Sequence, residues 1–288
     1  MIAGRLIYIM YTERNDSMKK ILSIILVFAL LFSIAACNKI PKDEAFTVET
    51  TTTVAPPVIK EQKHHEEFKD ENGRVVYVVD VVLPEVSYYA NEAVKDYLNR
   101  VSNEIFEDAC ESAENNIKNA SNFMDNLGFD KPWTNTITFE TTYSDGRFTC
   151  FLIKDAFSYT GGEGDPLYKT KCFDLKYGEP CSARTFAIAD FSMEDFNTSL
   201  VEALIIPTAQ KEFYPNNPYS LSDEMIEKFR SEFTLQNFYI TETGMAFYYD
   251  RTLFDGSLSG VYVCEFTWAE LSSVFCSPED VQAIEYAG

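Results

Sequence analysis

The alternation of apolar and polar positions along the chain predicts strands mixed with helices. A β-branched run over residues 75–83, bounded by glycine and proline, is typical of a strand buried on at least one face. Apolar residues then recur at steps of three and four over residues 90–127, which indicates a long amphipathic helix, or a bent pair of helices. Gly128 follows this pattern in the position of a helix C-cap.

Three hairpins are expected after this helix. The first would turn at Asp145-Gly146, and a two-residue type I′ turn there would set Phe139 opposite Leu152. The second would join residues 168–176 to 179–186 about Tyr177-Gly178. The third would join residues 238–241 to 245–249 at Thr243-Gly244 and set Ile240 opposite Phe247.

Helices are expected between the second and third hairpins. Ser192 resembles the start of a capping box, with Pro207 kinking or ending the helix that follows, and Ser222 would cap another helix. A last strand over residues 261–267 would precede a short helix around residues 269–275. The order favours an α+β fold: antiparallel sheets with a long N-terminal helix and two to three further helices packed on them. We expect an N-terminal subdomain over residues 68–160 and a C-terminal one over 161–288.

The N-terminal region has the pattern of an export signal. Residues 18–36 run from two lysines through an apolar stretch to small residues, as in a signal peptide, and are short for a permanent membrane span. Cys37 completes a sequence that resembles the bacterial lipobox, which predicts a lipidated cysteine and a protein anchored on the outer face of the cytoplasmic membrane. An ordinary signal or an uncleaved anchor is the alternative. Residues 1–17 carry acids where a signal should be basic, so we expect translation to begin at Met18.

The segment that follows the lipidation site has the composition of a tether. Residues 37–67 contain a threonine run and a proline pair without an apolar period, which predicts a disordered stalk. This segment holds His64 and His65, the two histidines of the chain, and we expect both to be solvated.

The charge of the chain excludes one class of partner. The 24 basic and 45 acidic residues give a formal charge of −21, and removal of residues 1–36 leaves 20 basic and 43 acidic residues, or −23. A surface of this sign repels a phosphate backbone, so no nucleic-acid partner is expected.

Six of the seven cysteines lie beyond Cys37, and they allow fifteen disulfide pairings. Cys172 and Cys181 are the most suggestive pair. A two-residue turn at Tyr177-Gly178 would leave them as diagonal neighbours, roughly 7 to 8 Å apart and too far for a bond, whereas a four-residue loop would set them opposite each other. Buried free thiols are the alternative.

The sequence contains no motif of a known catalytic or metal site. Both histidines lie outside the expected folded part, and no nucleophile elbow, Walker loop, dinucleotide fingerprint or zinc spacing occurs. No cofactor, metal ion or catalytic residue is therefore predicted. Paired carboxylates could serve a glycan hydrolase, but composition does not identify a pair among so many acids.

Two stretches resemble a known family. The segment 157–162, FSYTGG, leads into LYKTKCFDLKYG at 167–178, and FYIT at 238–241 leads into GMAFYY at 244–249. Together they resemble the extracytoplasmic domain of RsiV-type anti-sigma factors, and residues 74–157 are similar to its companion domain, which is also found in PdaC-type peptidoglycan deacetylases. The resemblance implies an α+β ectodomain that binds a ligand at the envelope, with Tyr159, Thr160, Gly161 and Gly162 as the candidate binding loop.

The resemblance also implies which activities are absent. A lipobox stands where the family has a sigma-binding segment and a transmembrane helix, and the catalytic deacetylase domain is missing, so neither activity is carried over. Glu163-Gly164 replaces an Ala-His pair of the family loop. We expect a non-enzymatic binding lipoprotein that recognises a cationic, lysozyme-like protein or a cell-wall component such as peptidoglycan. The alternatives are a carboxylate-dependent wall hydrolase and an accessory lipoprotein of a membrane complex.

Overall fold

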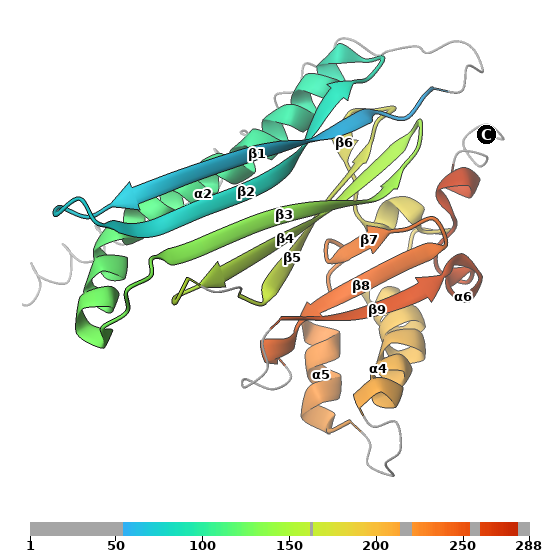
Figure 1. Ribbon diagram of the computed structural model, residues 1–288. Coiled ribbons are helices and arrows are strands. Elements are labelled where there is room, and N and C mark those ends of the chain that lie inside the picture. Colours follow the sequence, from blue (N-terminus) through green and yellow to red (C-terminus); the bar gives the residue numbers. More distant parts are fainter. Residues whose placement is uncertain (1–53, 162–163, 214–220, 254–259, 282–288) are drawn as a thin grey trace, which may run out of the picture. The chain divides into compact units, whose positions relative to one another are not determined.

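The computed structural model describes residues 54–161, 164–213, 221–253 and 260–281, which form two β-sheets with helices (Figure 1). The larger sheet has six strands in sequence order, and the smaller sheet has three in the order β7-β8-β9. The larger sheet contains β1 (Val58–Lys69), β2 (Val75–Tyr88), β3 (Trp133–Ser144), β4 (Phe148–Ser158), β5 (Pro166–Asp174) and β6 (Glu179–Pro180). The predicted α+β fold is confirmed.

A single long helix, α2 (Glu92–Leu127), connects β2 to β3 as the sequence predicts. The Asn91 side chain accepts hydrogen bonds from the backbone N–H groups of the first helical turn. At the other end Gly128 has φ 71° and donates its N–H to the carbonyl of Met124. The helix returns the chain to the end at which β2 began, so β2 and β3 pair in parallel, while the other pairs are antiparallel.

The C-terminal part begins with short helices, continues through the smaller sheet and then forms helix α6. It contains η1 (Ala183–Phe186), α3 (Met193–Phe196), η2 (Asn197–Ile205), α4 (Ile206–Phe213), α5 (Asp223–Ser231), β7 (Phe238–Ile240), β8 (Gly244–Asp250), η3 (Arg251–Leu253), β9 (Val261–Thr267) and α6 (Trp268–Leu271). The caps predicted at Ser192 and Ser222 are confirmed. The helix does not end at Pro207, because η2 is a π-helix that continues into α4 with the proline in its first turn.

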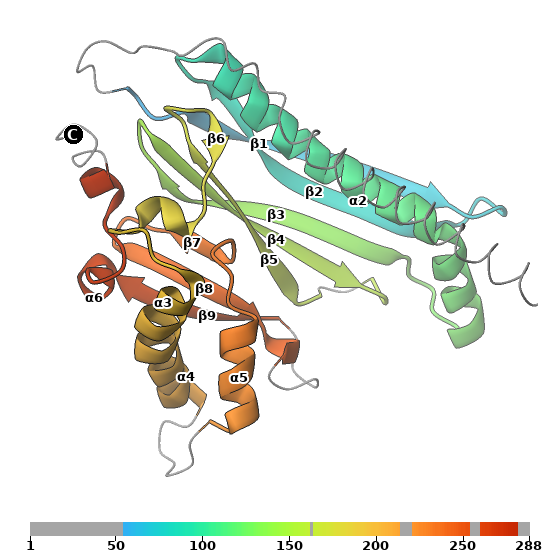
Figure 2. The ribbon, with the colours of Figure 1, turned by 180° about the vertical axis from the view of Figure 1, so that it is seen from behind.

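The first part of β4 is buried on both faces of the larger sheet, and its alternate residues serve two different cores. Phe151 and Ile153 pack with α2 and with the inward side chains of β2, such as Val79. Cys150 and Leu152 point to the opposite face and pack with the smaller sheet and its helices. Figure 2 shows α2 along β1 and β2, viewed from behind. This two-sided burial explains why residues 148–153 are all buried.

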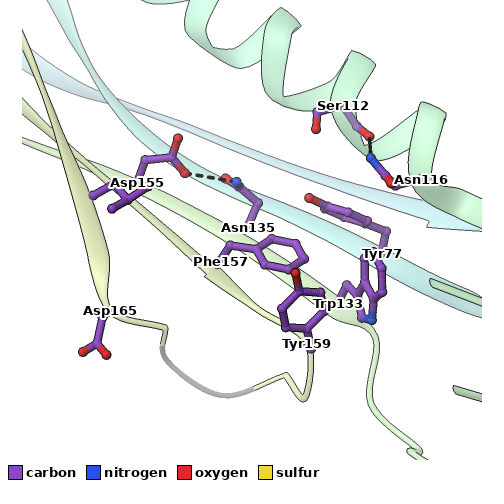
Figure 3. A pocket seen from close by; sticks show the side chains of 10 residues that line it. Tyr77, Ser112, Asn116, Trp133, Asn135, Asp155, Phe157, Tyr159 and Asp165 are labelled. Atoms are coloured by element: carbon purple, nitrogen blue, oxygen red, sulfur yellow. Dashed lines mark hydrogen bonds between the residues drawn. The ribbon is translucent and has the colours of Figure 1, made fainter. Parts of the chain in front are cut away.

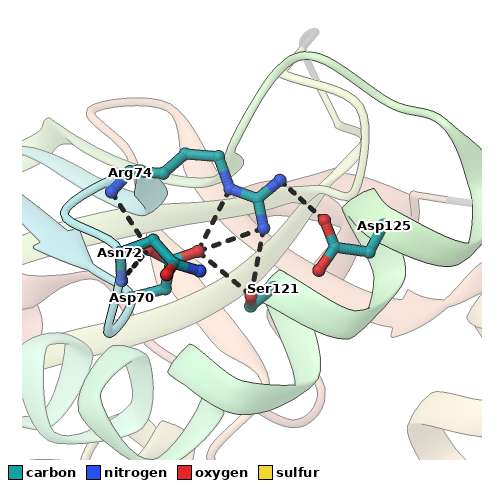
Figure 4. A network of polar contacts seen from close by, with 5 residues as sticks. All are labelled: Asp70, Asn72, Arg74, Ser121 and Asp125. Atoms are coloured by element: carbon teal, nitrogen blue, oxygen red, sulfur yellow. Dashed lines mark hydrogen bonds and ion pairs between the residues drawn. The ribbon is translucent and has the colours of Figure 1, made fainter.

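A polar network fastens the β1–β2 turn to α2 (Figure 4). Arg74 donates to Asp70 Oδ2 from Nε at 3.1 Å, to Ser121 Oγ at 3.0 Å and to Asp125 Oδ1 at 2.8 Å. Ser121 Oγ in turn donates to Asp70 Oδ2 at 3.2 Å. The network joins residues that are about 50 positions apart in the sequence, so it holds the end of the helix against the hairpin.

The stalk predicted over residues 37–67 is wrong for its last part, because residues 58–67 belong to strand β1. This strand pairs with β2 along its whole length. It lies at the sheet edge with most side chains exposed, so backbone hydrogen bonds rather than apolar side chains hold it in place. His64 is accordingly not solvated as expected; its ring stacks on Phe106 with centroids 4.3 Å apart. Residues 1–53, which hold the predicted signal and Cys37, lie outside the described residues.

All three predicted hairpins exist, but the second is shorter than expected, because β6 spans only Glu179–Pro180 and residues 183–186 of the predicted strand form η1. Each hairpin turns through four residues instead of two. The innermost pairs are Ser144 with Thr149, Asp174 with Glu179, and Ile240 with Met245. In the first turn the Asp145 carboxylate accepts hydrogen bonds from the backbone N–H groups of Arg147 and Phe148, which stabilises the wider loop.

Because of these wider turns, the observed registers differ from the predicted ones. Ile240 lies opposite Met245, not Phe247. In the first hairpin the wider turn shifts the pairing by two residues and a bulge in β3 shifts it back by one, so Phe139 lies opposite Ile153 rather than Leu152. The proposed division between residues 160 and 161 falls between β4 and β5, which pair directly within one sheet. The last predicted helix is shorter than expected and ends at Leu271.

Within the described ranges, no helix combines the length and the apolar character needed to cross a membrane.

Candidate functional site

A pocket of about 370 Å³ opens beside the predicted binding loop (Figure 3). Strands β2 to β5, helix α2 and the connection between β4 and β5 all contribute to it. Its lining residues are Tyr77, Ser112, Asn116, Trp133, Asn135, Asp155, Phe157, Tyr159, Asp165 and Leu167. The pocket therefore gathers side chains from segments that are far apart in the sequence.

Aromatic rings form one wall of the pocket. The parallel pairing of β2 with β3 sets Tyr77 opposite Trp133, and their ring centroids lie 6.2 Å apart. Phe157 on β4 packs 5.9 Å from Tyr77 and 5.6 Å from Trp133. Tyr159 follows the end of β4, with its centroid 4.7 Å from Phe157 and 5.0 Å from Trp133. Because Tyr159 is 53% exposed, its ring is the member of the wall most open to a ligand.

Carboxylate and amide groups form the other side. Asp155 accepts hydrogen bonds from Asn135 Nδ2 at 3.1 Å and from Lys169 Nζ at 2.8 Å. Figure 3 shows this Asp155–Asn135 pair on one side of Phe157 and the Tyr77–Trp133 pair on the other. Asp165 adds a second acid to the lining. The pocket thus combines aromatic faces with negative charge, a combination that attracts cations.

Burial also raises the pKa of one phenol in the wall. It raises the pKa of Tyr77 to about 12, and electrostatic interactions with Asp155 and Tyr159 add to the effect. The phenol of Tyr77 is therefore neutral at physiological pH and offers a hydrogen-bond donor. Two buried polar atoms of the lining, Trp133 Nε1 and Asn135 Oδ1, have no hydrogen-bond partner in the part of the chain that the structure describes.

The structure brings only part of the predicted loop to this pocket. Tyr159 lines it, whereas Thr160 is exposed and donates its backbone N–H to Ser158 Oγ at 3.3 Å. Gly161 has φ 68°, and a Cβ there would lie 2.8 Å from the Cβ of Lys131, so this position suits glycine. Gly162 lies outside the described residues.

Sequence reasoning missed Tyr77 and Trp133 as site residues. They are 56 positions apart, and only the parallel pairing of β2 with β3 brings them together. A long helix directly between two strands was the signal that could have indicated this pairing. The acids Asp155 and Asp165 carry no local signal that distinguishes them from the other carboxylates.

The predicted cysteine pair is brought together, although not in the pocket. The four-residue loop sets Cys172 directly opposite Cys181, with 3.1 Å between the Sγ atoms, and both are free thiols. A third thiol, Cys150, lies opposite Cys172 on the next strand.

No group of three or more metal-binding side chains with suitable geometry occurs in the described part of the chain. Neither this finding nor the pocket tests the expected absence of a cofactor, a metal ion or an enzymatic activity, which stays a prediction.

Comparison with known proteins relates the chain to an uncharacterised domain. No family profile matches the sequence, and neither does any curated protein. A solved member of the DUF3298 family from Bacteroides fragilis has the same fold, with a TM-score of 0.53 and 13% identity over 82% of this chain and 100% of that chain. A DUF3298 family protein from Pseudomonas aeruginosa covers 77% of this chain and 95% of its own, with 10% identity and a TM-score of 0.47. Both of these structural neighbours are thus DUF3298 family proteins, and the likeness to the first is one of fold.

Proposed function

We propose that this protein is a non-enzymatic binding lipoprotein of the cell envelope, and that its partner is a cationic protein of the lysozyme type. The observation that carries the proposal is the pocket that exposed Tyr159 lines together with Asp155 and Asp165. A lysine or arginine side chain of a basic protein fits such a pocket, because the ring face and the carboxylates both stabilise a positive charge.

The charge of the whole chain supports the same partner. A formal charge of −23 after removal of residues 1–36 would attract a basic protein over the distance of a Debye length and would raise the association rate. The pocket would then select the bound orientation, because it is the place where negative charge and aromatic faces meet.

The proposed location rests on the sequence. The signal pattern of residues 18–36, the lipobox at Cys37 and the resemblance to RsiV-type ectodomains favour attachment to the outer face of the cytoplasmic membrane. Sixteen residues, 38–53, separate Cys37 from the first described residue, Val54. Metabolic labelling with a palmitate analogue would test the anchor: label that persists in the Cys37→Ser variant would contradict it.

Binding to lysozyme tests the proposed partner. The purified protein is immobilised, and lysozyme is titrated over it at low and at physiological salt. The Tyr159→Ala change removes a ring that faces the ligand, and we expect a loss of about 1 kcal/mol, or about fivefold in Kd. The Asp155→Asn change removes charge while it keeps the shape of the side chain, and we expect weaker binding with a weaker salt dependence.

Matched controls separate the pocket from the general surface charge. Tyr88→Ala removes another exposed ring, 61% exposed, and Glu71→Gln removes another exposed acid; neither residue lines the pocket. Both controls should bind like the parent protein. If the folded protein binds no lysozyme at either salt, this partner is rejected, and if all four variants lose affinity equally, the pocket is not the binding site.

A cell-wall glycan is the second candidate. The amides of Asn116 and Asn135 beside the aromatic wall favour it, because a ring face flanked by hydrogen-bonding groups also suits a sugar. Binding of soluble muropeptides, lost in Tyr159→Ala and kept in Tyr88→Ala, would favour the glycan over the protein. Turnover of muropeptides that a single Asp→Asn or Glu→Gln change abolished would instead show a hydrolase.

A further inference from the structure

Three thiols form a continuous row on the face of the larger sheet that packs against the smaller sheet. Cys150 on β4 lies directly opposite Cys172 on β5, and Cys172 lies directly opposite Cys181, just after β6. The thiols of Cys172 and Cys181 are 3.1 Å apart, and Cys150 and Cys172 belong to the same buried cluster. Cys172 thus lies between two alternative partners.

The backbone geometry suits a bond between Cys172 and Cys181. Cys181 donates its N–H to the carbonyl of Cys172 at 2.8 Å, so the two are a hydrogen-bonded antiparallel pair. Directly opposed residues of such pairs have Cα atoms about 5.5 Å apart, which lies within the range that disulfides span. The two strands therefore need no rearrangement for the sulfur atoms to join.

The three thiols differ in access to solvent. Cys150 and Cys172 are 0% and 3% exposed, whereas Cys181 is only partly buried. Burial raises the pKa of the Cys172 thiol. An oxidant from solution would therefore meet Cys181 first, and Cys172 would react from inside the fold.

We propose that Cys172 and Cys181 form a disulfide on oxidation, and that Cys150 is an internal exchange partner that can take the place of Cys181. The Cys181 thiolate attacks a low-molecular-weight disulfide and forms a mixed disulfide, with release of one thiol. The Cys172 thiolate then attacks Cys181 Sγ, so the Cys172–Cys181 bond forms and the second thiol leaves. Two protein thiols have lost two electrons and two protons, and the small disulfide has become two thiols.

Exchange with Cys150 involves no further oxidation. Its thiolate attacks Cys172 Sγ, the Cys150–Cys172 bond forms, and Cys181 leaves as a thiolate that takes up a proton. The bond would move from the link between β5 and the segment after β6 to the link between β4 and β5. This chemistry is independent of the proposed ligand, because none of the three cysteines lines the pocket.

Peptide mapping distinguishes the two bonds. The full chain, purified in detergent, is treated with oxidised glutathione under native conditions, blocked by alkylation in denaturant and cut with trypsin. Lysine and arginine positions place the three cysteines in the separate peptides 148–154, 172–176 and 177–184. We expect the link between 172–176 and 177–184 to rise about tenfold or more on oxidation.

Variants test each half of the proposal. The oxidised parent protein should also show the link between 148–154 and 172–176, and Cys150→Ser should keep only the link to 177–184. Cys181→Ser and Cys172→Ser should show neither link, because each lacks one of the two thiols that form the first bond. Cys264→Ser changes another buried thiol, and it should behave like the parent protein. If the oxidised parent protein shows neither link, the disulfide is refuted whatever the variants do. If the oxidised parent protein shows no link between 148–154 and 172–176, the exchange role of Cys150 is refuted.

Discussion

A buried ion pair between two hairpin turns offers the sharpest test of the fold. Arg147, next to the β3–β4 turn, donates to Asp174 Oδ2 from Nε at 3.2 Å and from Nη2 at 2.9 Å. Arg147 is 8% exposed and Asp174 is 5% exposed, and the guanidinium lies over the ring of Phe148 at 4.7 Å. The other oxygen of Asp174 accepts a hydrogen bond from the backbone N–H of Lys176 at 3.0 Å. The pair therefore joins the two turns and orders one of them.

The Asp174→Ala change should be strongly destabilising. It leaves the buried guanidinium without this carboxylate, and it removes the hydrogen bond that orders the β5–β6 turn. Loss of one partner of a buried pair costs about 3 to 5 kcal/mol, so we expect the free energy of unfolding to fall by about 4 kcal/mol. Urea unfolding followed by tryptophan fluorescence measures this, and the midpoint should fall by about 1.5 M with the slope unchanged.

Two comparisons test whether burial of the ion pair is the reason for the predicted loss of stability. The double change Arg147→Met with Asp174→Leu removes both charges and should cost less than Asp174→Ala alone, because no buried charge remains uncompensated. Glu61→Ala breaks an ion pair whose side chains are 62% and 72% exposed, and it should cost less than about 1 kcal/mol. A loss below about 1 kcal/mol for Asp174→Ala would refute the reasoning, as would a double variant less stable than the single one.

Three further predictions follow from the backbone and from one buried phenol. Gly128→Ala should lower the free energy of unfolding by about 1 kcal/mol, because φ is 71° there. Nothing lies within 4 Å of the added Cβ, so no clash adds to this loss, and an unchanged melting temperature would contradict the prediction. Gly244→Ala should cost more than about 2 kcal/mol, because its Cβ would lie 1.8 Å from the carbonyl oxygen of Phe266; equal stability of the two alanine variants would contradict it. The pKa of Tyr77 is raised to about 12 from an unfolded value of about 10, so the folded state holds the proton more tightly. Its contribution to stability is complete below pH about 10 and is lost as the pH rises to about 12, and Tyr77→Phe should flatten the alkaline fall in unfolding free energy measured by urea titration.

Local signals predicted the helices well because helix ends depend on nearby atoms. Gly128 ends α2 in the left-handed conformation, and Ser192 begins α3 with its hydroxyl on the N–H of Asp195. Each of these interactions is made within four residues, so the sequence alone contains both partners. The strands β2 and β9 were predicted for a similar reason, since their own side chains alternate between core and surface or are apolar throughout.

Turn lengths were not predictable from the glycines. Asp145-Gly146 favours a two-residue turn when it is considered alone. In the folded chain the Asp145 carboxylate accepts hydrogen bonds from two backbone N–H groups, and Arg147 extends to Asp174 on another hairpin. The wider loop therefore depends on a partner 27 positions away. The same error at Tyr177-Gly178 made Cys172 and Cys181 diagonal neighbours in the prediction, whereas the structure sets them opposite each other.

Strand β1 was missed because its own side chains do not specify it. Residues 58–69 are mostly charged or polar, and Phe68 is their one buried side chain. The strand exists because β2 presents an unpaired backbone edge, and a polar chain can pair with that edge while its side chains remain in water. Sequence patterns report where side chains are buried. They are therefore weakest for an edge strand, whose stability lies in the backbone hydrogen bonds.

The candidate pocket follows from one geometric consequence of α2. A helix of 36 residues is about 54 Å long, and a strand of 14 residues is about 46 Å long. A helix of this length, packed along β2, returns the chain to the end at which β2 starts, so β3 must begin there and run parallel to it. Tyr77 and Trp133 lie near the beginnings of these two strands, and the parallel pairing makes them neighbours. The position of the aromatic wall was thus implied by the length of the helix, although the identity of its ligand was not.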